Sequence, residues 1–142
     1  MIKVFEMFSG YGGAAWGLKL ANIDFETIGI SEINPIAIKC YNTNFSNIKN
    51  YGDCSKIDTS ILPDFDLLTG GFPCQDVSSQ GSRDLTKGRT NLYKESLRII
   101  EAKKPKYILL ENVGGLNTMI VNERNLINIL TTDIKKICYQ DW

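Results

Sequence analysis

Residues 2–22 read IKVFEMFSGYGGAAWGLKLAN, which is an apolar run, a glycine-rich turn and a segment of good helix formers. This order predicts a strand over residues 2–8 that leads through the glycines into a helix over residues 12–22. Glycines in such a turn permit tight bends and close approach of a ligand, and the helix amino terminus adds N–H donors. The stretch therefore predicts an α/β protein with a ligand site after its first strand.

The rest of the chain repeats this alternation of strands and helices. Further strands are predicted over residues 25–31, 48–53, 65–70 and 107–112, with a sixth beginning at residue 137, and helices over 35–45, 91–104 and 123–137. Strands separated by helices of this length indicate a Rossmann-like α/β fold, a mostly parallel sheet with helices on both faces. Ligands of such folds bind beyond the carboxyl ends of the strands. Side chains that follow the strands should therefore meet at one edge.

Composition narrows the classes of protein and of site. The chain has 142 residues, 43% of them hydrophobic, which suffices for one domain with its own core. It has no histidine, so Ser-His-Asp and Cys-His hydrolases and histidine-ligated metal sites are excluded. The 4 cysteines show no CxxC spacing, and no signal peptide or membrane span is recognisable. We expect an intracellular protein with reduced thiols, without metal or membrane segment.

Two carboxylates suggest what the glycine turn binds. Glu32 ends the second predicted strand, where a carboxylate can accept both hydroxyls of a ribose. Asp53 ends the third, where it could receive an adenine amino group or cap the following turn. Because Gly10, Gly12 and Ala15 also satisfy GxGxxG/A, a nicotinamide-dependent oxidoreductase stays open, as does a tight turn without ligand. An adenosine-containing ligand is the common prediction of the two carboxylates.

A cysteine and a glutamate follow the next two predicted strands. Residues 70–81 read GGFPCQDVSSQG and place Cys74 among turn formers, where a thiol is presented rather than packed. Glu111 follows an apolar pair in LLEN, so we expect partial desolvation that favours proton donation. The alternative for Glu111 is a carboxylate that caps a turn. Residues 79–106 carry 8 basic and 3 acidic side chains. This excess of positive charge indicates either a patch that binds a polyanion or an ordinary solvated face.

Together these motifs resemble those of the DNA cytosine-5 methyltransferases. The resemblance rests on MFSGYGGAAWGL (7–18), GGFPCQDVSSQG (70–81) and ENV (111–113), in that order and spacing. The intervening blocks SEINPIAIKCYNTNF (31–45), GDCSKID (52–58) and GRTNLYKESLRII (88–100) also look like that family. The resemblance covers nearly the whole chain and implies a class I methyltransferase that uses S-adenosylmethionine and releases S-adenosylhomocysteine.

The resemblance also implies roles for individual residues. The Cys74 thiolate would add to C6 of a flipped cytosine, Glu111 would hydrogen-bond its N3 and amino group, and Asn112 would orient Glu111. Ser78 and Arg83 would contact DNA from a loop over residues 75–88, and Arg89 would contact it from the position directly after this loop. The cofactor-binding set would be Phe8, Ser9, Gly10, Tyr11, Gly12, Gly13, Glu32, Ile33, Asp53, Cys54, Pro73 and Leu92.

The family pattern continues beyond the last residue of this chain. We expect residues 1–142 to form an incomplete catalytic domain without the target-recognition domain, which needs a second polypeptide, a missing carboxyl-terminal part or another copy of itself. The alternative is a truncated remnant that binds cofactor, or acts as a decoy, without methylating. The setting implied is a cytoplasmic, nucleoid-associated protein of a bacterium or phage, as in restriction-modification.

Other enzymes with this fold explain fewer of the motifs. An adenine or RNA methyltransferase should carry an NPPY-like block after the fourth predicted strand, where this chain has TGGFPCQ. A nicotinamide-dependent oxidoreductase explains the glycines and Glu32 but leaves PCQ and ENV without a role.

Overall fold

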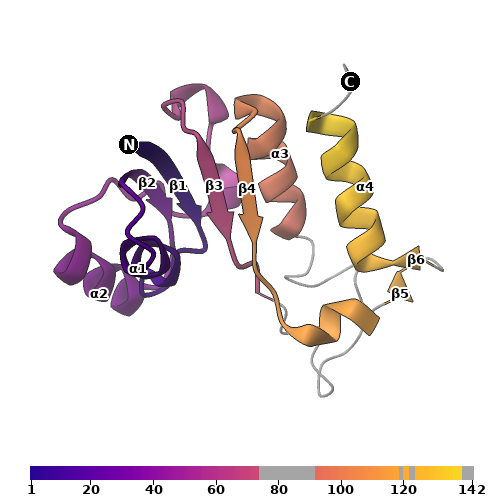
Figure 1. Cartoon of the computed structure of the whole chain (residues 1–142), viewed down its shortest axis with the longest axis horizontal. Helices are drawn as coiled ribbons and strands as arrows, with labels where there is room; N and C mark the ends of the chain where they lie inside the picture. The colour runs from indigo at the N-terminus through magenta and orange to yellow at the C-terminus, as the bar shows by residue number, and fades with distance from the viewer. Residues whose placement is uncertain (74–91, 119, 122–123, 139–142) are drawn as a thin grey trace. The chain divides into compact units, whose positions relative to one another are not determined.

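The computed structural model describes residues 1–73, 92–118, 120–121 and 124–138 (Figure 1). The chain divides into two compact units, the first formed by Met1–Gly71 with Pro105–Leu110 and the second by Phe72–Lys104 with Glu111–Trp142. Whether residues 1–142 act as one catalytic domain stays a prediction.

The first unit is built on a parallel sheet of four strands in the order β2-β1-β3-β4 (Figure 1). The strands are β1 (Ile2–Met7), β2 (Phe25–Ser31), β3 (Leu67–Gly70) and β4 (Tyr107–Leu110). Met7 is in register with Ser31 and with Gly70, so β1, β2 and β3 end level with one another. This confirms the Rossmann-like parallel sheet, and it places the residues after these strands at one edge.

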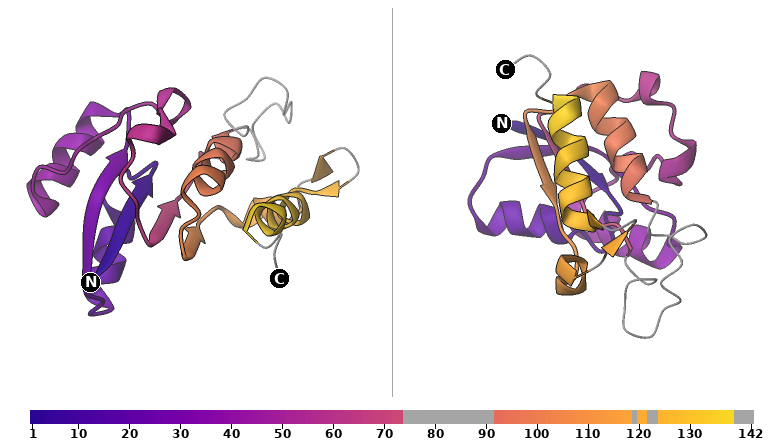
Figure 2. Two further views of the ribbon diagram at one scale, coloured as in Figure 1. Left: turned by 90° about the horizontal axis from the view of Figure 1, so that it is seen from above. Right: turned by 90° about the vertical axis from the view of Figure 1, so that its right-hand side faces the viewer.

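Two helices pack against the face of this sheet that carries Glu6. They are α1 (Gly13–Leu20) and α2 (Pro35–Phe45), and both lie beside β1 and β2 (Figures 1 and 2). Proline at the first position and Asn34 as the cap, which accepts two main-chain N–H groups, explain why α2 begins where it does. Ala15 of α1, Tyr41 of α2 and Ile30 of β2 form a fully buried cluster where the helices meet the sheet. The glycine turn is therefore held by a packed core.

The opposite face of β1 is covered by aromatic side chains from loops. Phe5 is fully buried, stacks on Phe65 at 5.4 Å and meets Tyr51 edge to face at 5.7 Å. Gly29 of β2 is needed there, because a Cβ at this position would lie 2.7 Å from the Tyr51 ring.

The strand predicted over residues 48–53 is wrong, because only one parallel bridge, Ile30 with Asn50, forms there. Beyond the bridge, the Asn50 side chain takes the main-chain bonds of Glu32, and Gly52 turns the chain with a φ of +71°. Short 3-10 helices at Cys54–Lys56 and Thr59–Ile61 follow instead. A single side chain therefore ends the ladder.

The second unit pairs α3 (Tyr93–Lys103) with α4 (Leu126–Cys138), which lie side by side (Figures 1 and 2). The strand predicted from residue 137 is wrong, since Ile137 and Cys138 still belong to α4, whose apolar period runs through them. A 3-10 helix, Gly114–Thr118, and a hairpin of β5 (Ile120–Val121) and β6 (Arg124–Asn125) precede α4. Strands this short leave no alternation in the sequence.

Two findings on the described residues bear on the classes of site and of protein. No group of three or more Cys, Asp and Glu side chains among them is arranged to hold a metal ion. None of the described helices has the length and apolarity that crossing a membrane requires.

Candidate cofactor site

The turn after β1 is the centre of the candidate site. Phe8, Gly10 and Gly12 have φ values of +52°, +53° and +89°, so the turn uses left-handed backbone three times. Left-handed backbone is unfavourable for phenylalanine, and strain of this kind is found mostly at functional sites. Cβ atoms at Gly10 and Gly13 would meet little or nothing, with only the Phe8 carbonyl at 3.9 Å from Gly10. The turn therefore leaves open space where a ligand could approach the backbone.

Gly12 plays a different part from its neighbours. A Cβ on Gly12 would lie 2.6 Å from Cε2 of Phe45 and 3.1 Å from Cδ2 of Tyr41. Real Cβ atoms do not approach other carbons this closely, so Gly12 packs the turn against α2. The glycines thus divide into one that fits the turn to the protein and two that leave its outer side open.

Ser9 supplies a polar group inside this turn. Ser9 is 8% exposed. Its hydroxyl oxygen is buried and has no hydrogen-bond partner in the part of the chain that the structure describes. A buried polar atom left unsatisfied is unfavourable, so such atoms mark places where a ligand or water completes the structure. Ser9 therefore fits a site for a polar ligand.

Glu32 joins the end of β2 to the glycine turn. Its Oε2 accepts the Gly10 N–H at 2.9 Å, and its Oε1 accepts the N–H groups of Ile33 and Asn34 at 2.9 and 2.8 Å. A carboxylate has about four acceptor positions, so it keeps capacity for a ligand hydroxyl. The structure thus brings together the two sequence features that suggested a nucleoside, the glycines and Glu32.

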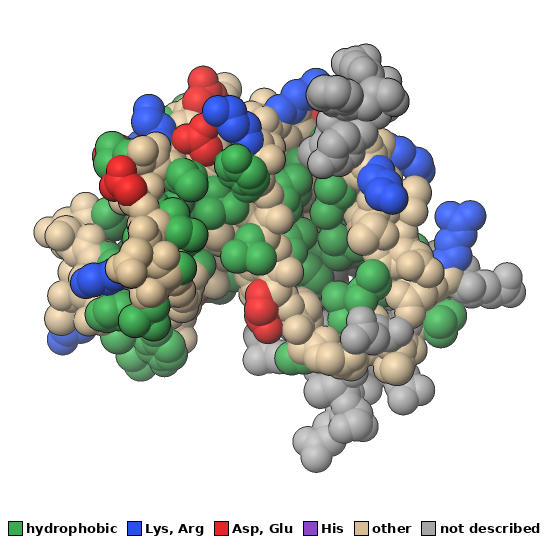
Figure 3. Space-filling model, in the orientation of Figure 1, with side chains coloured by type: hydrophobic (Ala, Val, Ile, Leu, Met, Phe, Trp, Pro, Cys, Tyr) green, Lys and Arg blue, Asp and Glu red, His purple; other side chains and the backbone are tan. Residues whose placement is uncertain are grey.

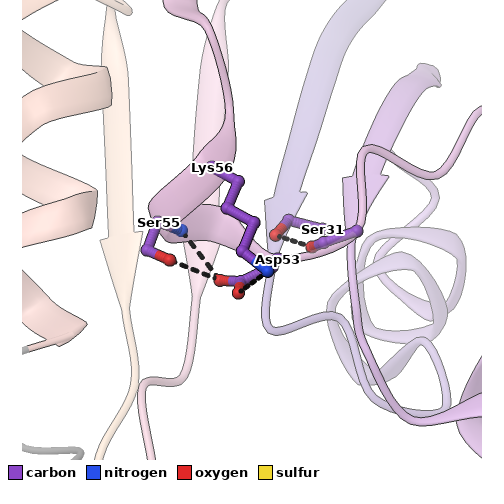
Figure 4. A network of polar contacts seen from close by, with 5 residues as sticks. Ser31, Asp53, Ser55 and Lys56 are labelled. Atoms are coloured by element: carbon purple, nitrogen blue, oxygen red, sulfur yellow. Dashed lines mark hydrogen bonds and ion pairs between the residues drawn. The ribbon is translucent and has the colours of Figure 1, made fainter.

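Asp53 is engaged within its own segment. Its Oδ1 accepts the N–H and the hydroxyl of Ser55 at 3.0 and 2.8 Å, and its Oδ2 pairs with the Lys56 ammonium at 3.6 Å (Figure 4). These interactions, above all the bond from the Ser55 hydroxyl, lower the pKa of Asp53 below its usual value. Of the two roles considered for Asp53, capping the following turn is the one this arrangement displays.

Two further residues of the predicted cofactor set differ in exposure. Ile33 is 74% exposed directly after Glu32, whereas Cys54 is buried with 5% exposed. An exposed isoleucine beside a carboxylate offers an apolar surface to a planar ring. Of the other members, Tyr11 is exposed, and Pro73 and Leu92 of the second unit are partly buried.

Asn50 and Ser31 were not predicted from the sequence, yet they hold Glu32 and the segment before Asp53 in place. Asn50 Oδ1 accepts the N–H groups of Glu32 and Gly52 at 3.1 and 3.0 Å, and its Nδ2 donates to the Glu32 carbonyl at 2.9 Å. The Ser31 hydroxyl donates to the Gly52 carbonyl at 2.7 Å. The signal that could have revealed Asn50 is an asparagine in a predicted strand, where this residue type is disfavoured.

Glu6 is a third residue that was not predicted from the sequence. It is 1% exposed, and its Oε1 accepts hydrogen bonds from the hydroxyls of Tyr41 and Thr27. Burial raises the pKa of Glu6, while bonds from Tyr41, Thr27 and the Ala15 N–H act in the opposite direction. An acidic residue inside the apolar run of β1 was the available signal. Glu6 links β1 to β2, to α2 and to the first turn of α1.

The predicted catalytic and DNA-contacting residues fall largely outside the described part of the chain. Cys74, Ser78, Arg83 and Arg89 all lie within residues 74–91, so their roles stay predictions. Glu111 is exposed, and the expected partial desolvation is wrong because β4 already ends at Leu110.

Asn112, a described member of the predicted catalytic set, makes two hydrogen bonds. Its Nδ2 donates to the carbonyl oxygen of Phe72 at 3.0 Å, and its Oδ1 accepts the Val113 N–H at 2.9 Å. Phe72 is buried, packs near Tyr93 with ring centroids 6.2 Å apart, and directly precedes Pro73 and the cysteine motif. Asn112 thus fastens the ENV segment to the residues that lead into that motif.

Comparison with known proteins gives one consistent result. The model of the family C-5 cytosine-specific DNA methylase matches residues 2–140. The orphan methyltransferase M.Rho11sI of Bacillus phage rho11s is 36% identical over 142 residues, covering 98% of this chain. The type II methyltransferase M.NgoBV of Neisseria gonorrhoeae is 41% identical over 122 residues, covering 82%. The crystal structure of S. pombe Dnmt2 methyltransferase superposes with a TM-score of 0.73 at 26% identity over 97% of the chain.

The similarity covers only part of each of these proteins. The chain spans 28% of the phage protein, 29% of the Neisseria protein and 40% of the S. pombe chain.

Proposed function

Because the chain belongs to the family of C-5 cytosine-specific DNA methylases, we propose that it carries the cofactor site and the nucleophile for methyl transfer to C5 of cytosine in DNA. The observation that carries the proposal is the joining of the glycine turn to Glu32, followed in the sequence by PCQ and ENV. The turn and Glu32 are suited to a nucleoside, and a thiol followed by a carboxylate and an amide suits addition to a pyrimidine.

The first unit has the groups to hold S-adenosylmethionine. Glu32 would accept a ribose hydroxyl, the Ser9 hydroxyl would gain a hydrogen-bond partner, and Phe8 and Ile33 would contact the adenine. Asp53 would accept a hydrogen bond from the adenine amino group. This bond would replace the weak ion pair with Lys56, whose side chain is 81% exposed. When bound, the cofactor supplies an electrophilic methyl group on a sulfonium. Further contacts of the first unit would come from the glycine turn, Tyr11 and Cys54.

The chemistry would begin with Cys74. Its thiolate forms a bond from sulfur to C6 of a flipped cytosine, which makes C5 nucleophilic toward the methyl group. Glu111 would hydrogen-bond N3 and the amino group, which offsets the charge that builds on the ring, while Asn112 holds the segment that carries Glu111. Once C5 carries the methyl group, a water molecule would accept the C5 proton while the C6–sulfur bond breaks, which returns the Cys74 thiolate and regenerates the free enzyme. Ser78, Arg83 and Arg89 would bind the nucleotide and its phosphates.

A second polypeptide, or a further part of a longer chain, would complete the enzyme. Among the described strands β4 pairs with β3 alone, and its Tyr107 and Leu109 are 58% and 56% exposed. Figure 3 shows apolar side chains gathered over β4 on this face. Exposed apolar strands at a sheet edge favour association, and the matched relatives are about three times longer. That second polypeptide or further part would also supply the DNA-reading surface.

Calorimetric titration with S-adenosylhomocysteine tests the cofactor part of this proposal. We expect saturable binding, and no binding of NAD under the same conditions. Glu32→Ala should weaken the affinity about tenfold or more, because it removes a charged acceptor. Binding of NAD in preference to S-adenosylhomocysteine would overturn the assignment and favour an oxidoreductase.

Covalent trapping tests the chemical part. DNA containing 5-fluorocytosine blocks the loss of the C5 substituent, so an active cysteine stays attached to it. The assay is run with the chain alone and together with the part of M.Rho11sI that lies beyond the matched region. We expect an adduct that Cys74→Ser abolishes and Cys40→Ser does not. Binding of S-adenosylhomocysteine with no adduct in either mixture would favour the non-catalytic remnant.

A further inference from the structure

We propose that Asn50 is a positioning residue for Glu32, the proposed acceptor of a ribose hydroxyl. Its side chain holds the Glu32 main chain in place at the point where the segment that carries Asp53 turns away from β2. The inference rests on the function proposed above, and it assigns a role to a residue that the glycine, cysteine and ENV motifs do not include. Asn50 is partly buried, and its amide makes three hydrogen bonds to main-chain atoms. The bonds all serve one local arrangement.

The bonds replace one step of a parallel strand ladder. Up to Asn50 the ladder is regular, since the Ile30 N–H donates to the Lys49 carbonyl at 3.0 Å and the Tyr51 N–H donates to the Ile30 carbonyl at 2.8 Å. In a continuing ladder, Glu32 would bond to the main chain at positions 51 and 53. Instead the Asn50 amide accepts from the Glu32 N–H and donates to its carbonyl.

Because the Asn50 amide replaces this ladder step, the segment after Asn50 can turn away from β2 while the main-chain N–H and carbonyl of Glu32 keep hydrogen-bond partners. Asn50 Oδ1 also accepts the Gly52 N–H, and Ser31 donates to the Gly52 carbonyl, so the departing segment is held at a fixed place. Gly52 turns with a φ of +71°, and Asp53 then caps a 3-10 helix. The Glu32 main chain is thereby satisfied, while its carboxylate stays directed at Gly10.

Only asparagine supplies this pattern at this reach. The two main-chain N–H groups that face Oδ1 define which end of the amide is oxygen, and the Glu32 carbonyl requires a donor at the other end. Aspartate keeps the acceptor but sets a second oxygen against the Glu32 carbonyl. Alanine removes all three bonds and frees Glu32 and Gly52 from each other.

The proposal is tested by pairing a protein change with a ligand change. S-adenosylhomocysteine and its 2′-deoxy analogue are titrated calorimetrically into the wild type, Asn50→Ala and Asn50→Asp. In the wild type, loss of the hydroxyl should weaken binding about tenfold or more, as expected for a bond to a carboxylate. In both variants this ratio should fall to about threefold or less, because Glu32 no longer holds its place. The coupling between residue and hydroxyl is then the measured quantity.

A merely structural role for Asn50 would weaken both ligands equally and leave the ratio unchanged, which would overturn the proposal. Asn44→Ala is the matched control, because Asn44 donates to the Cys40 carbonyl at 2.9 Å on the exposed side of α2, and its ratio should equal that of the wild type. Asn50→Asp keeps two acceptor bonds, so it answers the question if Asn50→Ala fails to fold. A wild type that binds neither ligand would refute the proposed function, and one that binds both equally would refute the role of Glu32 on which Asn50 acts.

Discussion

Replacing Gly12 by alanine should destabilise the first unit strongly. The new Cβ would lie 2.6 Å from Cε2 of Phe45 and 3.1 Å from the Tyr41 ring, on a backbone with a φ of +89°. Left-handed backbone costs an L-residue about 1–2 kcal/mol, and overpacking a filled site costs about 1–3 kcal/mol. Tyr41 is fully buried and bonded to Glu6, so it cannot move aside. The free energy of unfolding should therefore fall by about 2–5 kcal/mol.

Urea denaturation followed by tryptophan fluorescence measures this change, since Trp16 packs edge to face on Phe45 at 5.1 Å. Gly13→Ala is the matched control, because a Cβ there meets nothing within 4 Å and lies in the first turn of α1. That variant should unfold at the same urea concentration as the wild type, or at a higher one, since alanine stabilises helices by up to about 1 kcal/mol over glycine. Equal stability of Gly12→Ala and Gly13→Ala would refute the reasoning about the packed side of the turn.

Three further changes have defined outcomes. Asn34→Ala removes the cap of α2 and should lower the free energy of unfolding by about 1 kcal/mol, whereas Asn34→Asp should retain most of it in urea denaturation. Burial raises the pKa of Glu6 above its ordinary 4.5, so the stability of the wild type should fall as the pH rises from 4.5 through the pKa of the folded state. Glu6→Gln should not show this fall. Parallel curves of stability against pH for the two proteins would contradict the prediction. Asn112→Asp loses the donor to the Phe72 carbonyl and should slow formation of the trapped DNA adduct by roughly tenfold while leaving S-adenosylhomocysteine affinity unchanged; an unchanged adduct rate would contradict the positioning role.

The regular elements of the first unit could be predicted because local signals and packing agree there. Phe25–Ser31 forms β2 and Pro35–Phe45 forms α2 with the bounds expected from the sequence, since β-branched residues and an Asn-Pro start point the same way. The segment over residues 48–53 failed because its apolar pattern says nothing of the Asn50 amide. A side chain can replace a main-chain hydrogen bond of a sheet only where a neighbouring strand lies beside it. A local sequence pattern does not show which strand will be the neighbour.

The candidate site shows the same division. The glycines and Glu32 were found because their residue types and spacing suffice, and the structure joins them through one hydrogen bond. Glu6 and Asn50 were missed because their parts depend on Tyr41 and Glu32, which are distant in the sequence. The residue-level roles of Cys74 and Glu111 stay predictions, carried by the motifs and by membership of the family.

The strand order of the first sheet has a consequence for how the chain is made. β1 lies between β2 and β3, and its link to β3 joins Lys3 to Asp66, 63 positions apart. During synthesis β1 must therefore wait for its second neighbour until the residues of β3, Leu67–Gly70, have been made. During that interval one side of a strong apolar strand has no partner, a state prone to wrong pairing. Folding that completes late and slowly is the expected result of this topology.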